Sequence, residues 1–519
     1  MKKYLTIPIF VVAAMLTSCS DWLDVTPENA ISDEDLFENG FGYRNALNGI
    51  YINLADDALY GRELTWGFLS AIAQDYDQSA SVSSPAYADA SNLIYTSTET
   101  EPVVSAIWEK SYLAIANLNK LIENVVKANA GDFEYGDDER QLIYAEAVAL
   151  RAMLHFQLLR LFAPAPATDP TDVYLPYREH YEATAGERLT VKDFLEHVLL
   201  DLNTAEPILK HFDTVVHPEA MYASQMMDNA TPQWAARYRF LSTMYVDNMG
   251  LFFWFRGYRV NYLALLALKT RVGLYAGPDY YDLAYAAGRE LYTEYYQQRR
   301  WVGFTDIADL TANMNTRHTK AADDVLFGLN KQLLAENYLN IVLRTSGATS
   351  STRLPLANVQ SLYASDISGV YTDYRFSQLI GQTNESQSSY YSLKFMPSND
   401  ETTNAYEAPL IPVIRFSEVC HALASICAYR NRIAEGIGYI EAVRMARGAS
   451  RSLQLTVSNR QQLEEEILTD VRKEQTAEGG TFFEYKRRNL PTVPNANEQG
   501  QRTMAGHYTL PIPVSERTN

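Results

Sequence analysis

The side chains best suited to binding chemistry in this sequence are aromatic residues outside regular helical patterns. The chain has 519 residues, among them 36 tyrosines, 20 phenylalanines and 6 tryptophans. Most of the tyrosines are expected to pack between helices, but Tyr87, Tyr95 and Trp301 lie in stretches without a helical period. An aromatic face with a polar group at its edge can stack on a sugar ring or grip a peptide. These three residues are our candidates for ligand binding.

Motifs of several enzyme classes are absent from the sequence. It contains no G-x-x-x-x-G-K-[ST], no G-x-S-x-G and no H-E-x-x-H. The eight histidines lack metal-ligand spacing, and His155 and His421 lie in apolar helical runs where hydrogen-bonded core positions are expected. Among the 63 acidic residues, no pair is singled out by spacing as a catalytic pair. We therefore expect no catalytic site, no metal centre and no enzymatic activity.

Two pairs of acidic residues could help to hold a calcium ion. Asp75 with Asp77, and Asp323 with Asp324, place carboxylates close together along the chain, and calcium prefers oxygen ligands. Neither pair has the spacing of a calcium-binding loop, so we interpret both as solvated loops. The sequence predicts no cofactor.

The N-terminus carries a cysteine whose position favours lipid attachment. Lys2 and Lys3 precede an apolar run from Leu5 to Leu16, and Cys19 follows directly. The run is too short to span a bilayer comfortably and is typical of a signal peptide. Its ending, Leu-Thr-Ser-Cys, resembles a bacterial lipobox, in which the cysteine is acylated. We predict a signal peptide over residues 1–18 and a lipid anchor on Cys19, with a plain secretory peptide as the alternative.

The charge of the chain argues against nucleic acid as a partner. The formal net charge is −19, and an acidic surface repels phosphate backbones and anionic headgroups. Membrane attachment must then depend on the acylated cysteine, because no basic patch is available.

The remaining cysteines predict free thiols. Cys420 and Cys427 are seven residues apart in an apolar helical run. Two helical turns separate their Cα atoms by about 10.5 Å, beyond the limit of about 7 Å for a disulfide. We expect two buried free thiols on one helix.

The stretch from Ala145 to Pro166 predicts a central helix that positions the rest of the chain. Apolar residues cover more than half of its circumference, which predicts packing on several sides. Alanines allow close approach of neighbouring helices, and Pro164 and Pro166 stop the helix. The spacing of Ala152, Phe156 and Pro164 matches the second half of a tetratricopeptide repeat.

The remainder of the chain divides into four segments after the signal peptide. Residues 19–40 form a polar tether, and 41–298 a helical scaffold with a loop over 79–100, a cap at Thr190 and a hairpin over 261–296. Residues 299–412 are rich in loops with short β-prone pieces such as 325–327 and 341–343. Residues 413–519 form C-terminal helices and an extended tail. Long loops in a compact protein are often functional, so we assign 299–412 to the ligand side.

Several motifs in order resemble those of the SusD/RagB family of Bacteroidetes nutrient-uptake lipoproteins. They are the lipobox with Asp21-Trp-Leu-Asp24, the block AEAVALRAMLHFQLLRLFAPAP, Asp201-Leu-Asn203-x-Ala205, Leu274-Tyr275-x-Gly277-x-x-Tyr280, Pro412-Val-Ile-Arg415-Phe-Ser-Glu418, Arg472-x-Glu474 with Glu478-Gly479, and Leu510-Pro-Ile-Pro513. Ala163 replaces a usual glycine, and Gly480 and Thr481 depart from the late block.

The resemblance implies a mainly α SusD-like fold with tetratricopeptide-like hairpins and a loop-rich region with short strands. It implies an outer-membrane lipoprotein that faces the exterior, captures a glycan and passes it to a SusC-like TonB-dependent porter. The matching motifs belong to the scaffold, so they transfer no ligand residue.

Two other functions stay open at this point. The same architecture could bind peptides, as RagB-like members do, since loops 79–100 and 299–412 do not discriminate between ligands. A surface glycan hydrolase is disfavoured because no catalytic constellation is found.

Overall fold

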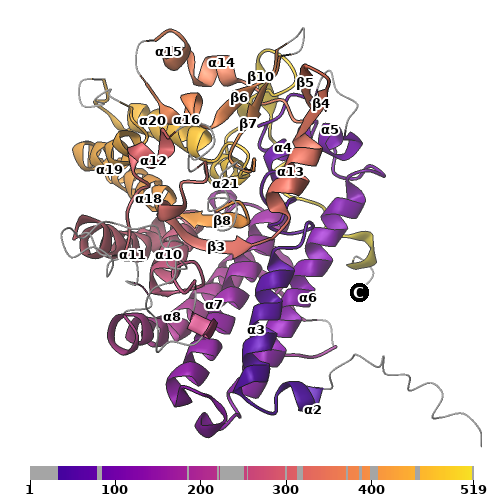
Figure 1. The fold of residues 1–519 in the computed structure, drawn as a ribbon, viewed down its shortest axis with the longest axis vertical. Coiled ribbons are helices and arrows are strands. Elements are labelled where there is room, and N and C mark those ends of the chain that lie inside the picture. Colours follow the sequence, from indigo (N-terminus) through magenta and orange to yellow (C-terminus); the bar gives the residue numbers. More distant parts are fainter. Residues whose placement is uncertain are drawn as a thin grey trace, which may run out of the picture.

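Helix α7 (Gly136–Phe162) is the central helix that the sequence predicts. It packs against α6 (Glu101–Val125) on one side and α8 (Val191–His211) on another (Figure 1). Acidic residues in its first turn stabilise the positive end of the helix dipole, and it ends just before Pro164. By length and composition α7 could cross a membrane, but 94% of its apolar window is buried inside the protein. Packing on more than one side is confirmed.

The structure is a computed structural model that describes most of the chain. The described residues are 33–78, 84–183, 186–218, 221, 251–253, 255–298, 301–312, 319–369, 372–384, 388–397, 407–449 and 456–516. The predicted signal peptide, Cys19 and most of the tether lie outside them.

Ion pairing joins α7 to α8 at residues of two sequence motifs. Arg151 on α7 donates hydrogen bonds of 2.8 and 2.7 Å to Asp201 on α8, and the Tyr177 hydroxyl donates one of 2.6 Å to the same carboxylate. His155, one turn along α7, accepts a hydrogen bond from the Arg178 amide at 2.9 Å and donates to the Arg151 carbonyl at 3.0 Å. Burial holds the pKa of His155 well below its usual range, so the ring is neutral. The predicted hydrogen-bonded core histidine is confirmed.

The predicted hairpin over 261–296 consists of α10 (Tyr262–Ala276) and α11 (Tyr281–Glu290). The Asn261 side chain caps α10 by accepting from the Ala264 amide at 2.9 Å. A Cβ atom at Gly273 would lie only 2.9 Å from the Cβ of Ala284. The two helices therefore cross closely at a pair of small residues.

In its described residues, the C-terminal part adds four α-helices and an extended tail. The helices are α18 (Phe416–Tyr429), α19 (Ile433–Ala446), α20 (Arg460–Glu474) and α21 (Gly480–Arg487). The tail returns to the central helix, where the Leu510 amide donates to the Leu161 carbonyl at 2.9 Å. Cys420 and Cys427 are buried free thiols on α18, as predicted.

Strands in the described residues occur as five short antiparallel pairs. The pairs are β1 (Val173–Pro176) with β2 (Arg188–Thr190), β3 (Val325–Asn330) with β8 (Leu410–Arg415), β4 (Leu343–Ser346) with β5 (Thr349–Thr352), β6 (Ile380–Gln382) with β7 (Tyr390–Ser392), and β9 (Thr492–Pro494) with β10 (Gln501–Thr503). The β3–β8 pair is the buried one, and it crosses the molecule above α3 (Gly40–Leu54) in Figure 1. The expected mainly α fold with short strands is confirmed.

The remaining α-helices of the described residues are short and lie before or between the longer helices and the strand pairs along the chain. They are α2 (Asp33–Leu36), α4 (Phe68–Ile72), α5 (Pro85–Ser91), α12 (Ile307–Leu310), α13 (Leu334–Val342), α14 (Val359–Leu362), α15 (Ala364–Ile367) and α16 (Tyr374–Ser377).

Two local predictions are wrong. The predicted loop over 79–100 contains α5, which begins at Pro85 because proline suits the first turn of a helix. The predicted β-prone piece 341–343 lies mostly in α13, where Ala335, Tyr338 and Val342 are buried at helical spacing. Tertiary burial on one face overrode the β preference of Ile341 and Val342.

Buried ion pairs join the region before β8 to the C-terminal helices. Arg375 lies 2.8 Å from both Asp373 and Asp470 of α20, and Arg447 lies 2.9 Å from Glu474 and 2.5 Å from Asp324. One apolar cluster also runs from Tyr43 to Leu510, across the three segments predicted for residues 41–519. The segment boundaries at 41, 299 and 413 stay predictions.

Candidate ligand-binding site

A cleft of about 360 Å³ lies between α3, the turn around Phe255 and the β3–β8 strand pair. We call it the aromatic cleft. The described residues that line it are Asn48, Tyr51, Ile52, Phe252, Phe255, Tyr258, Arg259, Gly328, Leu329, Asn330 and Leu410. Its size and its lining of apolar surface with a few polar groups are typical of small-ligand sites.

The turn from Phe252 to Arg259 supplies most of the aromatic surface. Phe255 has φ of 59°, in the left-handed region that a bulky side chain rarely adopts. The turn is held by a hydrogen bond of 2.8 Å from the Tyr258 amide to the Phe255 carbonyl, and the Gly328 amide of β3 donates to the Tyr258 carbonyl at 2.9 Å. Strained backbone conformations of this kind cluster at functional sites of proteins.

Buried charges fix the wall of the aromatic cleft to the central helix. Glu146 of α7 accepts from Arg259 at 2.9 and 3.1 Å, from Arg256 at 2.9 Å and from the Tyr51 hydroxyl at 2.5 Å. Arg256 also pairs with Asp213 at 2.8 Å. Burial, with the nearby Glu146 charge, raises the pKa of Tyr51, so its hydroxyl stays protonated and donates.

The guanidinium of Arg259 orients two of the rings in the aromatic cleft. Its central carbon lies 4.4 Å from the Phe252 ring centre and 5.6 Å from that of Tyr51. Cation–π attraction of this kind stabilises rings in one orientation. Because its donors are already directed to Glu146 and the Phe252 carbonyl, Arg259 acts as a support for the rings.

The arrangement suits binding by stacking and hydrogen bonding. Tyr51 and Phe255 are partly exposed, and the amides of Asn48 and Asn330 are exposed at the rim. Aromatic faces beside amide donors and acceptors match the alternating apolar and hydroxyl surfaces of a sugar. The Glu146 carboxylate is committed to its three partners, so it is poorly placed for acid catalysis.

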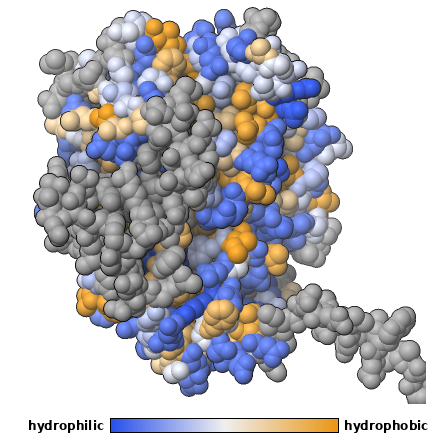
Figure 2. All heavy atoms as spheres, viewed as in Figure 1, coloured by the Kyte–Doolittle hydropathy of each residue, from blue (hydrophilic) through white to orange (hydrophobic). Residues whose placement is uncertain are grey.

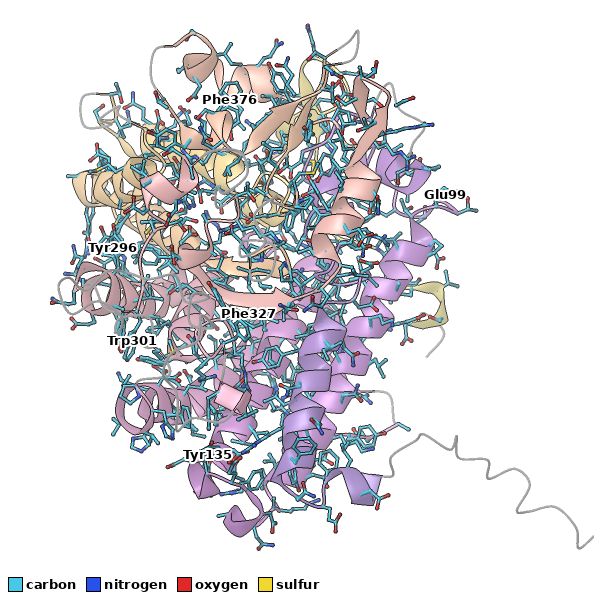
Figure 3. All side chains as sticks on the ribbon, in the orientation of Figure 1. Glu99, Tyr135, Tyr296, Trp301, Phe327 and Phe376 are labelled. Carbon is cyan, nitrogen blue, oxygen red and sulfur yellow. The ribbon has the colours of Figure 1, made fainter. Side chains whose placement is uncertain are left out.

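The three aromatic residues predicted from the sequence do not line the aromatic cleft. Tyr87, Tyr95 and Trp301 are only 5%, 6% and 8% exposed. The Tyr87 hydroxyl donates to Glu63 at 3.2 Å, that of Tyr95 donates to the His507 carbonyl at 2.9 Å, and Trp301 stacks on Tyr295. Figure 3 shows Trp301 well apart from Phe327, the β3 residue whose ring lies near Tyr51. Their role in ligand binding stays an untested prediction.

The two acidic pairs lie in different settings. Asp75 accepts from the Ala477 amide at 3.1 Å, and burial raises its pKa to about 6. Asp324 is buried between Arg447 and Arg415, so the interpretation of this pair as a solvated loop is wrong. Among the described residues, no group of three or more histidine, cysteine or acidic side chains could hold a metal. Calcium binding stays untested.

The sequence reasoning missed the residues of the aromatic cleft. A signal was present in the run FFWFRGYR at 252–259, a dense series of aromatic residues and arginines without helical period. The partners of this run at positions 48, 51 and 330 carry no such signal, since tertiary folding brings them together.

Comparisons with known families and relatives agree on one kind of protein. Residues 21–245 match the family model SusD-like_3, described as "Starch-binding associating with outer membrane". SusD-like protein P2 of Formosa agariphila is 28% identical over 208 residues, and SusD-like protein P38 of the same organism is 25% identical over 211 residues. The matched region spans 38% of the length of each of these curated relatives.

Solved structures share the fold over nearly the whole chain. A SusD superfamily protein from Bacteroides thetaiotaomicron has a TM-score of 0.67 at 20% identity, covering 92% of this chain and 97% of that one. A SusD-like carbohydrate binding protein from Bacteroides vulgatus has a TM-score of 0.64 at 16% identity, with coverage of 92% and 96%. At such low identity these likenesses concern the fold.

Proposed function

We propose that this chain is a SusD-like protein that captures glycans at the cell surface without cleaving them; the match of residues 21–245 to the family model and the shared fold support this proposal. The observation that carries the proposal is the aromatic cleft, in which the partly exposed rings of Tyr51 and Phe255 lie beside exposed rim amides and Tyr51 is held by the buried Glu146 and Arg259. The family description and the carbohydrate-binding neighbour support the same ligand class.

We propose that the sugar rings stack on Tyr51 and Phe255, the partly exposed rings of the aromatic cleft. The rim amides of Asn48 and Asn330 then bind the sugar hydroxyls from opposite walls, α3 and β3. Glu146 and Arg259 keep the cleft open in the absence of ligand, because their hydrogen bonds hold the rings in place. Preorganisation of this kind lowers the entropy lost on binding.

The cellular setting is part of the proposal. An acylated Cys19 anchors the protein in the outer membrane, facing the exterior, and a SusC-like TonB-dependent porter receives the captured glycan. The lipobox-like sequence at the N-terminus and the words of the family description support this setting.

The test uses soluble protein that starts at Ser20, run by affinity electrophoresis in gels containing a panel of polysaccharides. We expect retardation by at least one polysaccharide, and restored mobility when Phe255 is replaced by alanine. The replacement Tyr429→Ala is a matched control, because Tyr429 is an exposed aromatic residue on α18 that does not line the aromatic cleft.

Two other outcomes would contradict the proposal. Heat from a mixed peptide pool in calorimetry, with no retardation by any glycan, would indicate a peptide-binding protein. Release of shorter sugars from a retarding polysaccharide would indicate a hydrolase.

A further inference from the structure

A second cavity, of about 110 Å³, lies between α7, α10, α18, α21 and the turn before α4. It shares no lining residue with the aromatic cleft. The residues that matter for its chemistry are Tyr60, Gln157, Arg160, Arg271, Tyr275 and Glu418. The Glu418 side chain is 28% exposed, so solvent reaches this cavity.

Arg160 brings a buried positive charge to the wall of this cavity. It is only 7% exposed, and its guanidinium lies 3.8 Å from the Phe483 ring centre and 4.7 Å from that of Phe156. Its Nη2 donates to the side-chain oxygen of Gln157. Within the described part of the chain, no carboxylate lies at ion-pair distance from Arg160, whereas Arg151 pairs with one carboxylate and Arg256 with two. Among the described residues, the charge of Arg160 therefore has aromatic rings and a more distant Glu418 near it but no carboxylate in direct contact.

The charged side chains near Arg160 do not supply it with a carboxylate partner. Arg271 pairs with Glu418, whose Oε2 lies 2.6 Å from Nη2. Lys486 lies beneath Arg160 and donates to the carbonyls of Arg160 and Ala163 at 2.6 Å each. The other lining carboxylates, Glu478 and Glu484, are also paired with arginines.

Burial of an unpaired charge is costly unless a counter-charge or strong hydrogen bonds offset it. Burial, with the nearby charge of Arg271, lowers the pKa of Arg160 to about 9, so Arg160 is still protonated at neutral pH. A negative ligand would offset the cost.

Hydrogen-bond donors without protein partners surround the same space. In the described part of the protein, Tyr60 Oη, Tyr275 Oη, Gln157 Nε2 and Arg160 Nε are buried and lack a hydrogen-bond partner. The amide oxygen of Gln157 is already used by Arg160, so its free group is a donor. Unsatisfied buried polar atoms are rare and call for an explanation. A set of donors around a positive charge complements an anion.

We propose that this cavity binds a small inorganic oxyanion of the size of sulfate or phosphate. Arg160 supplies the compensating charge, and Tyr60, Tyr275 and Gln157 supply hydrogen bonds to the anion oxygens. The bound anion joins α7 to α10 and to the turn before α4, and so stabilises the packing of these elements.

The test is calorimetric titration of sodium sulfate into soluble protein starting at Ser20, in a buffer free of sulfate and phosphate. Ionic strength is held constant with sodium chloride. We expect saturable binding of one sulfate per protein in the titration, and a melting temperature that rises with the logarithm of the sulfate concentration above the dissociation constant. Tyr60→Phe and Tyr275→Phe should each weaken the affinity about tenfold or more, since each removes a hydrogen bond to a charged group.

These two variants separate anion binding from a structural role of the residues. Each removes a hydroxyl without a protein partner, so stability in the absence of sulfate should not fall. Tyr177→Phe is the matched control, because the Tyr177 hydroxyl is bound to Asp201. It should lower stability and leave the sulfate affinity unchanged.

Two results would overturn the proposal. One is the absence of saturable sulfate binding to the unmodified chain. The other is equal sulfate binding by the unmodified chain, Arg160→Gln and Tyr60→Phe. A stabilisation that rises linearly with sulfate in every variant would count as the general salting-out effect and against a site.

Discussion

The carboxylate of Glu146 lies 2.9 Å from Nη2 of Arg259, and this pair joins the central helix to the wall of the aromatic cleft. Both groups are buried, and Arg259 in turn orients the rings of Phe252 and Tyr51. The central helix of the scaffold thereby determines the geometry of the surface at which we propose that glycans bind.

Removal of an exposed ring from the aromatic cleft should weaken glycan binding. Phe255→Ala removes a partly exposed stacking surface, so we expect the affinity for the retarding polysaccharide to fall about tenfold, with little change in melting temperature. Affinity electrophoresis and thermal melts measure the two quantities. An equal loss of affinity in Tyr429→Ala would argue against the cleft as the site.

Loss of the Glu146 charge should destabilise the protein. Glu146→Gln leaves Arg259 buried without a carboxylate and Arg256 with Asp213 alone, so we expect the free energy of unfolding to fall by about 3 kcal/mol. Asp137→Asn breaks a more exposed pair with Arg140 and should cost less than about 1 kcal/mol. Urea unfolding compares the two, and similar effects would show that the buried network contributes little.

A buried lysine should make stability depend on pH. Burial lowers the pKa of Lys320 to about 7 from the ordinary value of 10.5, although Glu407 opposes the shift. Between these values the unfolded chain binds a proton that the folded chain does not bind, so this lysine makes stability rise from about pH 7 to pH 10.5.

Lys320→Met should remove this rise. The free energy of unfolding, measured in urea at several pH values from about 7 to 10, should depend less steeply on pH than in the unmodified chain. Lys110→Met removes one exposed lysine and serves as the control. An unchanged slope in Lys320→Met would mean that the lysine is protonated in the folded state.

The aromatic residues that the sequence predicts as ligand candidates are buried in the structure. Their contribution to the stability of the core can be tested. Because Trp301 stacks on Tyr295 and is nearly inaccessible, we expect Trp301→Ala to lower the free energy of unfolding by about 3 to 5 kcal/mol. Tyr87→Ala should act in the same direction. A variant with unchanged stability and weaker glycan binding would instead support the predicted ligand role.

The lipid anchor gives a prediction in cells. Cys19→Ala removes the thiol that acylation requires, so we expect the protein to leave the membrane fraction, measured by fractionation and immunoblotting. Replacement of Ser18 by alanine keeps a small residue before the cysteine and should leave the protein in the membranes. Membrane retention of Cys19→Ala would contradict the anchor.

Some features of this protein follow from the sequence because their causes are local. The helical character of residues 145–162, the stop before Pro164, the cap at Thr190 and the free thiols of α18 depend on residues within a few turns of each other. Helical period, capping and proline geometry act over this range. The tract from Ala145 to Pro166 was therefore identified as a core helix without knowledge of its neighbours.

The aromatic cleft is decided only by the tertiary structure. Tyr51, Glu146, Asp213 and Arg259 are far apart along the chain, and no periodic pattern links them. Tyr87 and Trp301 were chosen because their local sequence lacks a helical period, yet both are buried, and Tyr87 lies on helix α5. The surface of the described residues mixes apolar and hydrophilic groups (Figure 2), so composition alone does not mark the site. Burial and charge pairing depend on which distant segments pack together, and local sequence does not contain that information.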